Sequence, residues 1–111
     1  MNWNNIENLQ DIDAVIQASF NKPQVIFKHS TTCSISQMAK SRLDRFNNEE
    51  NSIDFHYLDL LRLRPISNFI AEKFSVHHES PQILLIKNGE CTYDESHMGI
   101  VVDDILEQAA I

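Results

Sequence analysis

The chain has 111 residues, the usual length of one globular domain, and a hydrophobic fraction of 42% that supports one core, so we expect a single domain over residues 1–111. Its 16 acidic residues against 9 basic ones give a formal net charge of -7, which repels phosphate backbones and anionic lipid and argues against nucleic-acid and membrane partners. No apolar run approaches the ~20 residues of a membrane span and residues 1–5 lack the features of a signal peptide, so we expect a cytoplasmic protein, and nothing requires more than a monomer.

Hydrophobic periodicity divides the chain into alternating helices and strands. Apolar residues three or four positions apart predict helices, and apolar–polar alternation or a short apolar run predicts strands. In chain order the pattern predicts a helix over residues 9–20, a strand at 25–27, a helix over 35–46, a strand at 53–57, a helix over 65–74, strands at 83–86 and 91–93, and a helix over 101–109. The second helix is expected to end in the polar run 47–51 and to bury one apolar face, formed by Ile35, Met38, Ala39, Leu43 and Phe46.

Proline and glycine mark three boundaries between these elements. Pro23 follows the first helix as a stop signal, and Pro65 suits the first position of the third helix. The Asn88-Gly89 pair accommodates the positive φ angles of a type I′ turn and predicts a hairpin between the last two strands. Strand–helix–strand units followed by a hairpin imply an α/β fold, a mixed four-stranded sheet flanked by helices on both faces. This is the thioredoxin-like layout.

Cys33 falls at the turn between the strand at 25–27 and the helix over 35–46. The amino end of a helix has unpaired backbone N–H groups and the positive end of the helix dipole, which favour a thiolate over a thiol. Thiolate is the attacking species in disulfide exchange, so Cys33 is a candidate nucleophile. The alternative is that Cys33 is simply a small residue at a helix start.

Polar residues surround Cys33 in the sequence. Thr32, Ser34 and Ser36 can offer hydroxyl groups to a substrate or to the sulfur, although Ser and Thr are also common helix caps. Lys28 and His29 are expected to add positive charge that supports a thiolate. These residue types therefore suit thiol chemistry without proving it.

Two further segments are expected to face Cys33. Ser80-Pro81 precedes the strand at 83–86, the place where thioredoxin-like proteins have a cis-proline opposite the reactive cysteine. A cis bond there would turn backbone groups near Ser80 toward an extended disulfide substrate. Ser96 and His97 precede the last helix, whose amino end is expected to bind a carboxylate of a thiol ligand.

The sequence resembles the monothiol bacilliredoxins, thioredoxin-fold proteins of the bacillithiol system in low-GC Gram-positive bacteria. Three blocks carry the resemblance, at residues 27–36, 64–72 and 78–82. It implies that Cys33 removes bacillithiol from S-bacillithiolated proteins, with bacillithiol as a thiol co-substrate and no bound cofactor. Ser34 stands where the family motif Thr-Cys-Pro-Ile-Ser has proline.

The cysteine spacing predicts a monothiol cycle. Ser36 occupies the third position after Cys33, so no Cys-x-x-Cys pair exists and an external thiol must release any adduct. Cys91 lies beyond the hairpin, roughly 15 Å or more from Cys33 at ~3.3 Å per residue, whereas a disulfide needs Cα atoms within ~7 Å. We therefore expect Cys91 to be a structural strand residue.

Other readings of the same residues stay open. One is a non-catalytic thioredoxin-fold module, either a protein-binding domain or an iron–sulfur carrier like the monothiol glutaredoxins, although Ser34-Ile35 stands where those proteins have Gly-Phe. Another is an arsenate-reductase-like regulator, which would need a longer chain and an arginine-rich site. Histidines also gather in loops expected near Cys33, but their spacing matches no zinc pattern and we expect no metal: His29, His77, His78 and His97.

Overall fold

The computed structural model describes residues 1–46 and 52–111. Its elements, in chain order, are β1 (Trp3–Asn5), α1 (Leu9–Ala18), β2 (Gln24–His29), α2 (Ser34–Asp44), β3 (Asp54–Asp59), α3 (Arg64–Phe74), β4 (Gln82–Lys87), β5 (Glu90–Ser96), the short 3-10 turn η1 (His97–Gly99) and α4 (Val102–Ala109). The second helix ends at Asp44, slightly before its predicted end at residue 46, and the polar run 47–51 lies outside the described residues. No helix in the described ranges combines the length and the apolar character that crossing a bilayer would need.

The described residues form a five-stranded mixed sheet in the order β1-β3-β2-β4-β5. The strands β1, β3 and β2 run parallel, whereas β4 pairs antiparallel with β2 and β5 pairs antiparallel with β4. The predicted mixed sheet is confirmed, but the expected count of four strands is wrong by the edge strand β1. Because Trp3–Asn5 is only three residues long, it is too short to show a periodic pattern in the sequence.

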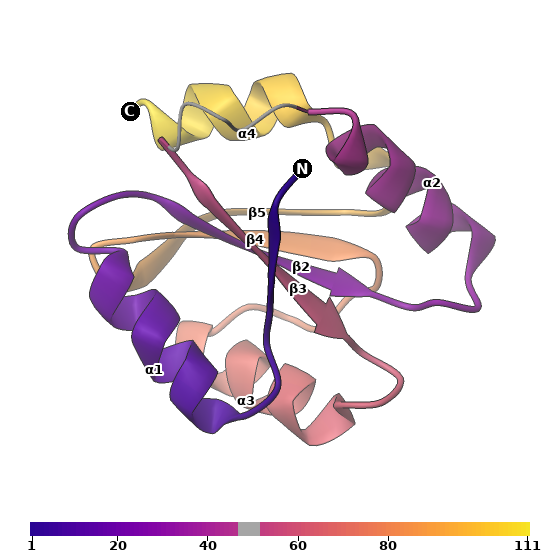
Figure 1. The fold of residues 1–111 in the computed structure, drawn as a ribbon, viewed down its shortest axis with the longest axis horizontal. Helices are drawn as coiled ribbons and strands as arrows, with labels where there is room; N and C mark the ends of the chain where they lie inside the picture. Colours follow the sequence, from indigo (N-terminus) through magenta and orange to yellow (C-terminus); the bar gives the residue numbers. More distant parts are fainter. Residues whose placement is uncertain (47–51) are drawn as a thin grey trace.

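Helices cover both faces of the sheet, with α2 and α4 on one side and α1 and α3 on the other (Figure 1). The central strand β2 is buried along its whole length, and its side chains alternate between the two layers. Val25 and Phe27 belong to the core cluster under α2 and α4, whereas Ile26 belongs to the cluster over α1 and α3. Burial of each such side chain stabilises the fold by about 1.5–3 kcal/mol.

The buried face of α2 agrees with the prediction only in its second half. Ala39 and Leu43 are buried and Phe46 packs against the core, as predicted. Ile35 and Met38, however, are 40% and 50% exposed, and Ser36 is buried. The physical reason is that the Ser36 hydroxyl is buried with hydrogen-bond partners at His29 and Ser30. A hydrophobicity pattern does not register such hydrogen bonds. Two apolar side chains therefore remain on the surface close to the start of the helix.

The remaining boundaries agree with the sequence. Pro65 lies in the first turn of α3, and the Ser80-Pro81 peptide bond is cis. Asn88 and Gly89 have φ angles of 53° and 81°, as a type I′ hairpin turn requires. A side chain at position 89 would also meet the ring of Phe20, since a Cβ there would lie 3.0 Å from the Cζ atom.

Candidate active site

Cys33 lies at the N-cap of α2, directly after the loop that leaves β2. Its φ and ψ angles are -101° and 123°, an extended conformation, and its side chain makes no capping hydrogen bond. Backbone hydrogen bonds hold the residue in place: its N–H donates to the Ser30 carbonyl at 3.2 Å, and its own carbonyl accepts from Gln37 at 3.0 Å. The half-buried thiol is thus fixed at the positive end of an eleven-residue helix with its sulfur not used in capping.

Ser36 ties the end of β2 to the first turn of α2. Its hydroxyl oxygen lies 2.7 Å from Nδ1 of His29 and accepts the Ser30 N–H at 3.0 Å. The side chain is fully buried, so the expected direct contact with a substrate is replaced by a structural role. Ser36 fixes the loop that carries Cys33.

His29 does not supply the positive charge that the sequence suggested. The ring is 4% exposed, stacks on Phe27 with centroids 5.5 Å apart, and lies beside Tyr57. Burial, with a further contribution from the Lys40 ammonium, holds the pKa of His29 below its ordinary value. The imidazole is therefore mainly neutral at pH 7 and acts as the hydrogen-bond partner of Ser36.

Lys28 lies on the opposite face of the sheet from α2. Its ammonium group is fully buried, donates to the Ser67 carbonyl at 3.2 Å, and lies 3.3 Å from Nδ1 of His78. Burial lowers the pKa of Lys28 to about 8, and the pKa of His78 is lowered by burial and then by Lys28. Contrary to the prediction, Lys28 therefore does not place its charge beside Cys33. It contacts His78 instead and so holds the segment that leads to Ser80-Pro81.

The cis-proline segment continues the line of β4 toward the Cys33 loop. Lys28 pairs with Gln82 in the β2–β4 register, so Pro81 lies beside the end of β2. The Pro81 carbonyl accepts the N–H of His97 at 2.9 Å, which fixes the segment after β5 to the cis-proline. The Ser80 hydroxyl is buried without a hydrogen-bond partner among the described residues.

Ser96 and His97 precede the last helix, as predicted, and their part in substrate binding stays a prediction. The last helix α4 begins at Val102, and η1 separates it from β5, so neither residue lies at its amino end. His97 has a positive φ of 55°, which turns the chain into the short 3-10 turn instead of the helix. Ser96 is instead the N-cap residue of the three-residue turn η1, and the His97 ring lies 3.6 Å from the Glu79 carboxylate.

Exposed polar groups border the Cys33 loop. Thr32 and Ser34 are both exposed on either side of the cysteine, and the side-chain amide of Gln37 donates to the Thr31 carbonyl at 2.7 Å. Within residues 1–46 and 52–111, no three His, Cys, Asp or Glu side chains lie together in a way that could hold a metal ion.

Cys91 occupies a different setting at the other end of the sheet. It pairs with Ile86, which in turn pairs with Gln24 at the start of β2, whereas Cys33 follows the end of β2. The six residues of β2 separate these ends by roughly 16 Å, so the two cysteines cannot form a disulfide. Both are free, and burial raises the pKa of Cys91 to about 11.

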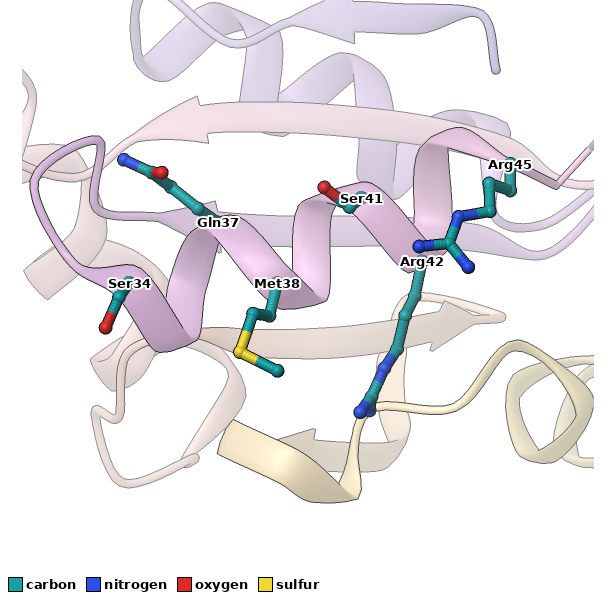
Figure 2. Close-up of a pocket in the computed structure, with 6 residues that line it drawn as sticks. All are labelled: Ser34, Gln37, Met38, Ser41, Arg42 and Arg45. Carbon is teal, nitrogen blue, oxygen red and sulfur yellow. The ribbon is translucent and has the colours of Figure 1, made fainter.

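A surface pocket of about 590 Å³ follows the outer face of α2, starting at the residue after Cys33 (Figure 2). Its lining comes from α2 and from Arg45, the residue that caps the end of this helix: Ser34, Gln37, Met38, Ser41, Arg42 and Arg45. Neither arginine was predicted from the sequence to belong to the site. The available signal was their spacing, because residues three, four, seven and eight positions apart share one helix face.

Together, the sheet order, the cis-proline and the cysteine at the start of α2 define a thioredoxin-fold protein. The chain belongs to the monothiol bacilliredoxin BrxC family, whose model matches residues 4–105, and this places it among thiol oxidoreductases. A solved structure described as a proposed oxidoreductase with a thioredoxin fold is 34% identical, with a TM-score of 0.82 over 96% of this chain and 92% of that one.

More distant structures share the fold. Thioredoxin from Trypanosoma brucei brucei is 10% identical, with a TM-score of 0.75 over 98% of this chain and 88% of that one. Thioredoxin from Fasciola hepatica is 17% identical, with a TM-score of 0.73 over 96% of this chain and 95% of that one.

Proposed function

We propose that this protein removes bacillithiol from S-bacillithiolated proteins in the cytoplasm, as a monomer that uses Cys33 alone. The observation that carries the proposal is the setting of Cys33: a half-buried sulfur at the amino end of α2, not used as a cap. The cis-proline lies in the segment that leads into β4, the strand beside β2. The helix terminus stabilises the thiolate, and the open position gives it access to a disulfide. Membership of the monothiol bacilliredoxin family supports bacillithiol as the co-substrate.

The reaction is a pair of thiol–disulfide exchanges. The Cys33 thiolate attacks the bacillithiol sulfur of a mixed disulfide, forms a Cys33–bacillithiol disulfide, and releases the client protein as a thiolate. A second thiolate from an external low-molecular-weight thiol then attacks the bacillithiol sulfur of the adduct and releases Cys33. The client cysteine is reduced, and the external thiol and bacillithiol leave joined as a disulfide.

Two observations support a one-cysteine cycle over a two-cysteine cycle. Ser36 stands where a second active-site cysteine would lie, and its side chain is buried in hydrogen bonds to His29 and Ser30. Cys91 lies at the opposite end of the sheet, and its thiol donates to the Tyr93 carbonyl at 3.4 Å. An external thiol is therefore needed to complete the cycle.

The test is intact-protein mass spectrometry after mixing the protein with a bacillithiolated client. We expect one bacillithiol adduct that maps to Cys33, together with the free client. The Cys33→Ser variant should form no adduct, whereas Cys91→Ser should behave as the wild type does. An unmodified wild-type protein, or an adduct on Cys91, would overturn the proposal.

A further inference from the structure

The pocket along α2 brings positive charge close to the proposed nucleophile. It begins at Ser34, the residue next to Cys33, and ends at Arg42 and Arg45. Figure 2 shows Arg45 turned back along the helix toward Arg42, whereas Arg42 extends away from α2 toward the chain that follows β5. Arg42 donates there to the Met98 carbonyl at 3.4 Å, a long contact that leaves most of its N–H groups available.

These two guanidinium groups lie together in an acidic protein. Three of its other cations pair with carboxylates, as Lys22 does with Asp54, Lys40 with Asp44 and Arg62 with Glu7. Over the ranges 1–46 and 52–111, neither Arg42 nor Arg45 has a carboxylate within ion-pair distance, a property that they share with Arg64 and Lys73. Within these described ranges, the end of the pocket therefore carries two positive charges in a chain whose net charge is -7.

The distance along α2 from Cys33 to the two arginines sets how long a molecule attached to Cys33 must be to contact them. A rise of 1.5 Å per residue places Arg42 about 13 Å and Arg45 about 18 Å along the helix from Cys33. Side chains on a helix lean toward its amino end, which shortens the reach back to the sulfur. Cysteine or 2-mercaptoethanol attached to Cys33 would be too short to contact either arginine.

We propose that this pocket binds the carboxylate end of the low-molecular-weight thiol whose sulfur is attacked by Cys33, with Arg42 and Arg45 as the recognition residues. The inference rests on the proposed function and names the part of the ligand that the protein recognises. Guanidinium groups bind carboxylates through paired N–H donors. Bacillithiol fits this arrangement, because a sugar separates its thiol from a malate dicarboxylate.

The middle of the pocket suits the polar centre of such a ligand. Ser34 and Ser41 offer hydroxyl groups and Gln37 offers an amide, all of which can hydrogen-bond to sugar hydroxyls. Met38 supplies an apolar side chain that adapts its shape to the ligand. The order thiol, sugar and carboxylate therefore matches the order Cys33, polar groups and arginines along α2.

The test compares two substrates that differ only in the small thiol. One client protein is modified with bacillithiol or with 2-mercaptoethanol, and kcat/KM for its reduction is measured for each. In the Arg42→Gln/Arg45→Gln variant we expect kcat/KM to fall about tenfold for the bacillithiol adduct and to change less than about twofold for the other adduct. Raising the salt concentration should reduce the wild-type preference for the bacillithiol adduct.

Lys73 provides a matched control. Arg42 and Lys73 each lie in the last turn of an eleven-residue helix, so Arg42→Gln and Lys73→Gln remove the same charge from equivalent helix positions. Lys73→Gln should leave the ratio of the two kcat/KM values unchanged. Equal losses for both adducts, or no loss in the arginine variants, would overturn the pocket assignment. A wild-type protein that fails to act on the bacillithiol adduct would instead overturn the proposed function.

Discussion

The two cysteines of this protein show how position in the fold decides the chemistry of one side chain. Cys33 lies at a helix start, in extended backbone, with a sulfur that is not used in capping. Cys91 lies in β5, where its thiol donates to the Tyr93 carbonyl and burial raises its pKa to about 11. Cys33 therefore lies beside the unpaired backbone N–H groups of a helix start, whereas burial in the strand keeps Cys91 protonated.

The comparison predicts a large difference in alkylation rate. At pH 7 a thiol with a pKa of about 11 is ionised in on the order of one molecule in ten thousand, and only the thiolate reacts. We expect iodoacetamide to modify Cys33 at least about 100-fold faster than Cys91, measured by time-resolved peptide mass spectrometry. Similar rates in the folded protein would contradict the comparison, and unfolding in urea should remove the difference.

A second prediction concerns the hydrogen bonds that hold the Cys33 loop. Ser36→Ala leaves the buried Ser30 N–H and the His29 ring without their partner, and we expect the free energy of unfolding to fall by about 2 kcal/mol. Ser34→Ala, at an exposed position in the same turn, should change it by less than about 0.5 kcal/mol. Urea denaturation measures both values. Equal effects of the two substitutions would show that Ser36 does not organise this loop.

Much of the fold was predictable because hydrophobic spacing alone indicates its regular elements. The buried run 83–86 and the Asn88-Gly89 turn indicated the hairpin directly, since few residues tolerate positive φ angles. The position of Cys33 followed from the same reasoning, because a strand followed by a helix leaves the connecting residue at the helix start.

The errors arose where a single interaction outweighs a pattern. The pattern placed Ile35 and Met38 inside together with Ala39 and Leu43, but at the start of α2 it is Ser36 that is buried, through its hydrogen bonds, while Ile35 and Met38 are exposed. His97 adopts a positive φ that its residue type does not require, so a separate turn before α4 could not be anticipated. Lys28 is adjacent to His29 in sequence, yet neighbouring strand residues point to opposite faces of the sheet. The hydrogen-bond partner of Lys28 is the Ser67 carbonyl in α3, a contact that the sequence does not show.

The pocket along α2 was missed for a different reason. Charged residues on a helix usually mark a solvated face, so Arg42 and Arg45 drew no attention in the sequence. What distinguishes them is their place in one surface pocket with Ser34, the residue after Cys33. Spacing could have shown that these residues share one helix face, but not that a pocket lies along it.

The smallest predicted effect concerns the stability contributed by Cys91 at alkaline pH. Its pKa is about 11 in the folded protein and about 9 when exposed, so between these values the unfolded chain loses its proton first. Stability from this group is fully present below pH 9 and is lost as the pH rises toward 11. Between pH 8 and 10.5 the full difference between these pKa values would lower the free energy of unfolding of the wild type by about 2 kcal/mol relative to Cys91→Ala. Because the thiol is only partly buried, we expect about half of this, about 1 kcal/mol, measured by urea denaturation. Lys28 and the tyrosines titrate in both proteins and cancel in this difference. If the difference in free energy of unfolding between the wild type and Cys91→Ala does not change with pH, the pKa of Cys91 is not raised. The contrast between the two cysteines would then rest on Cys33 alone.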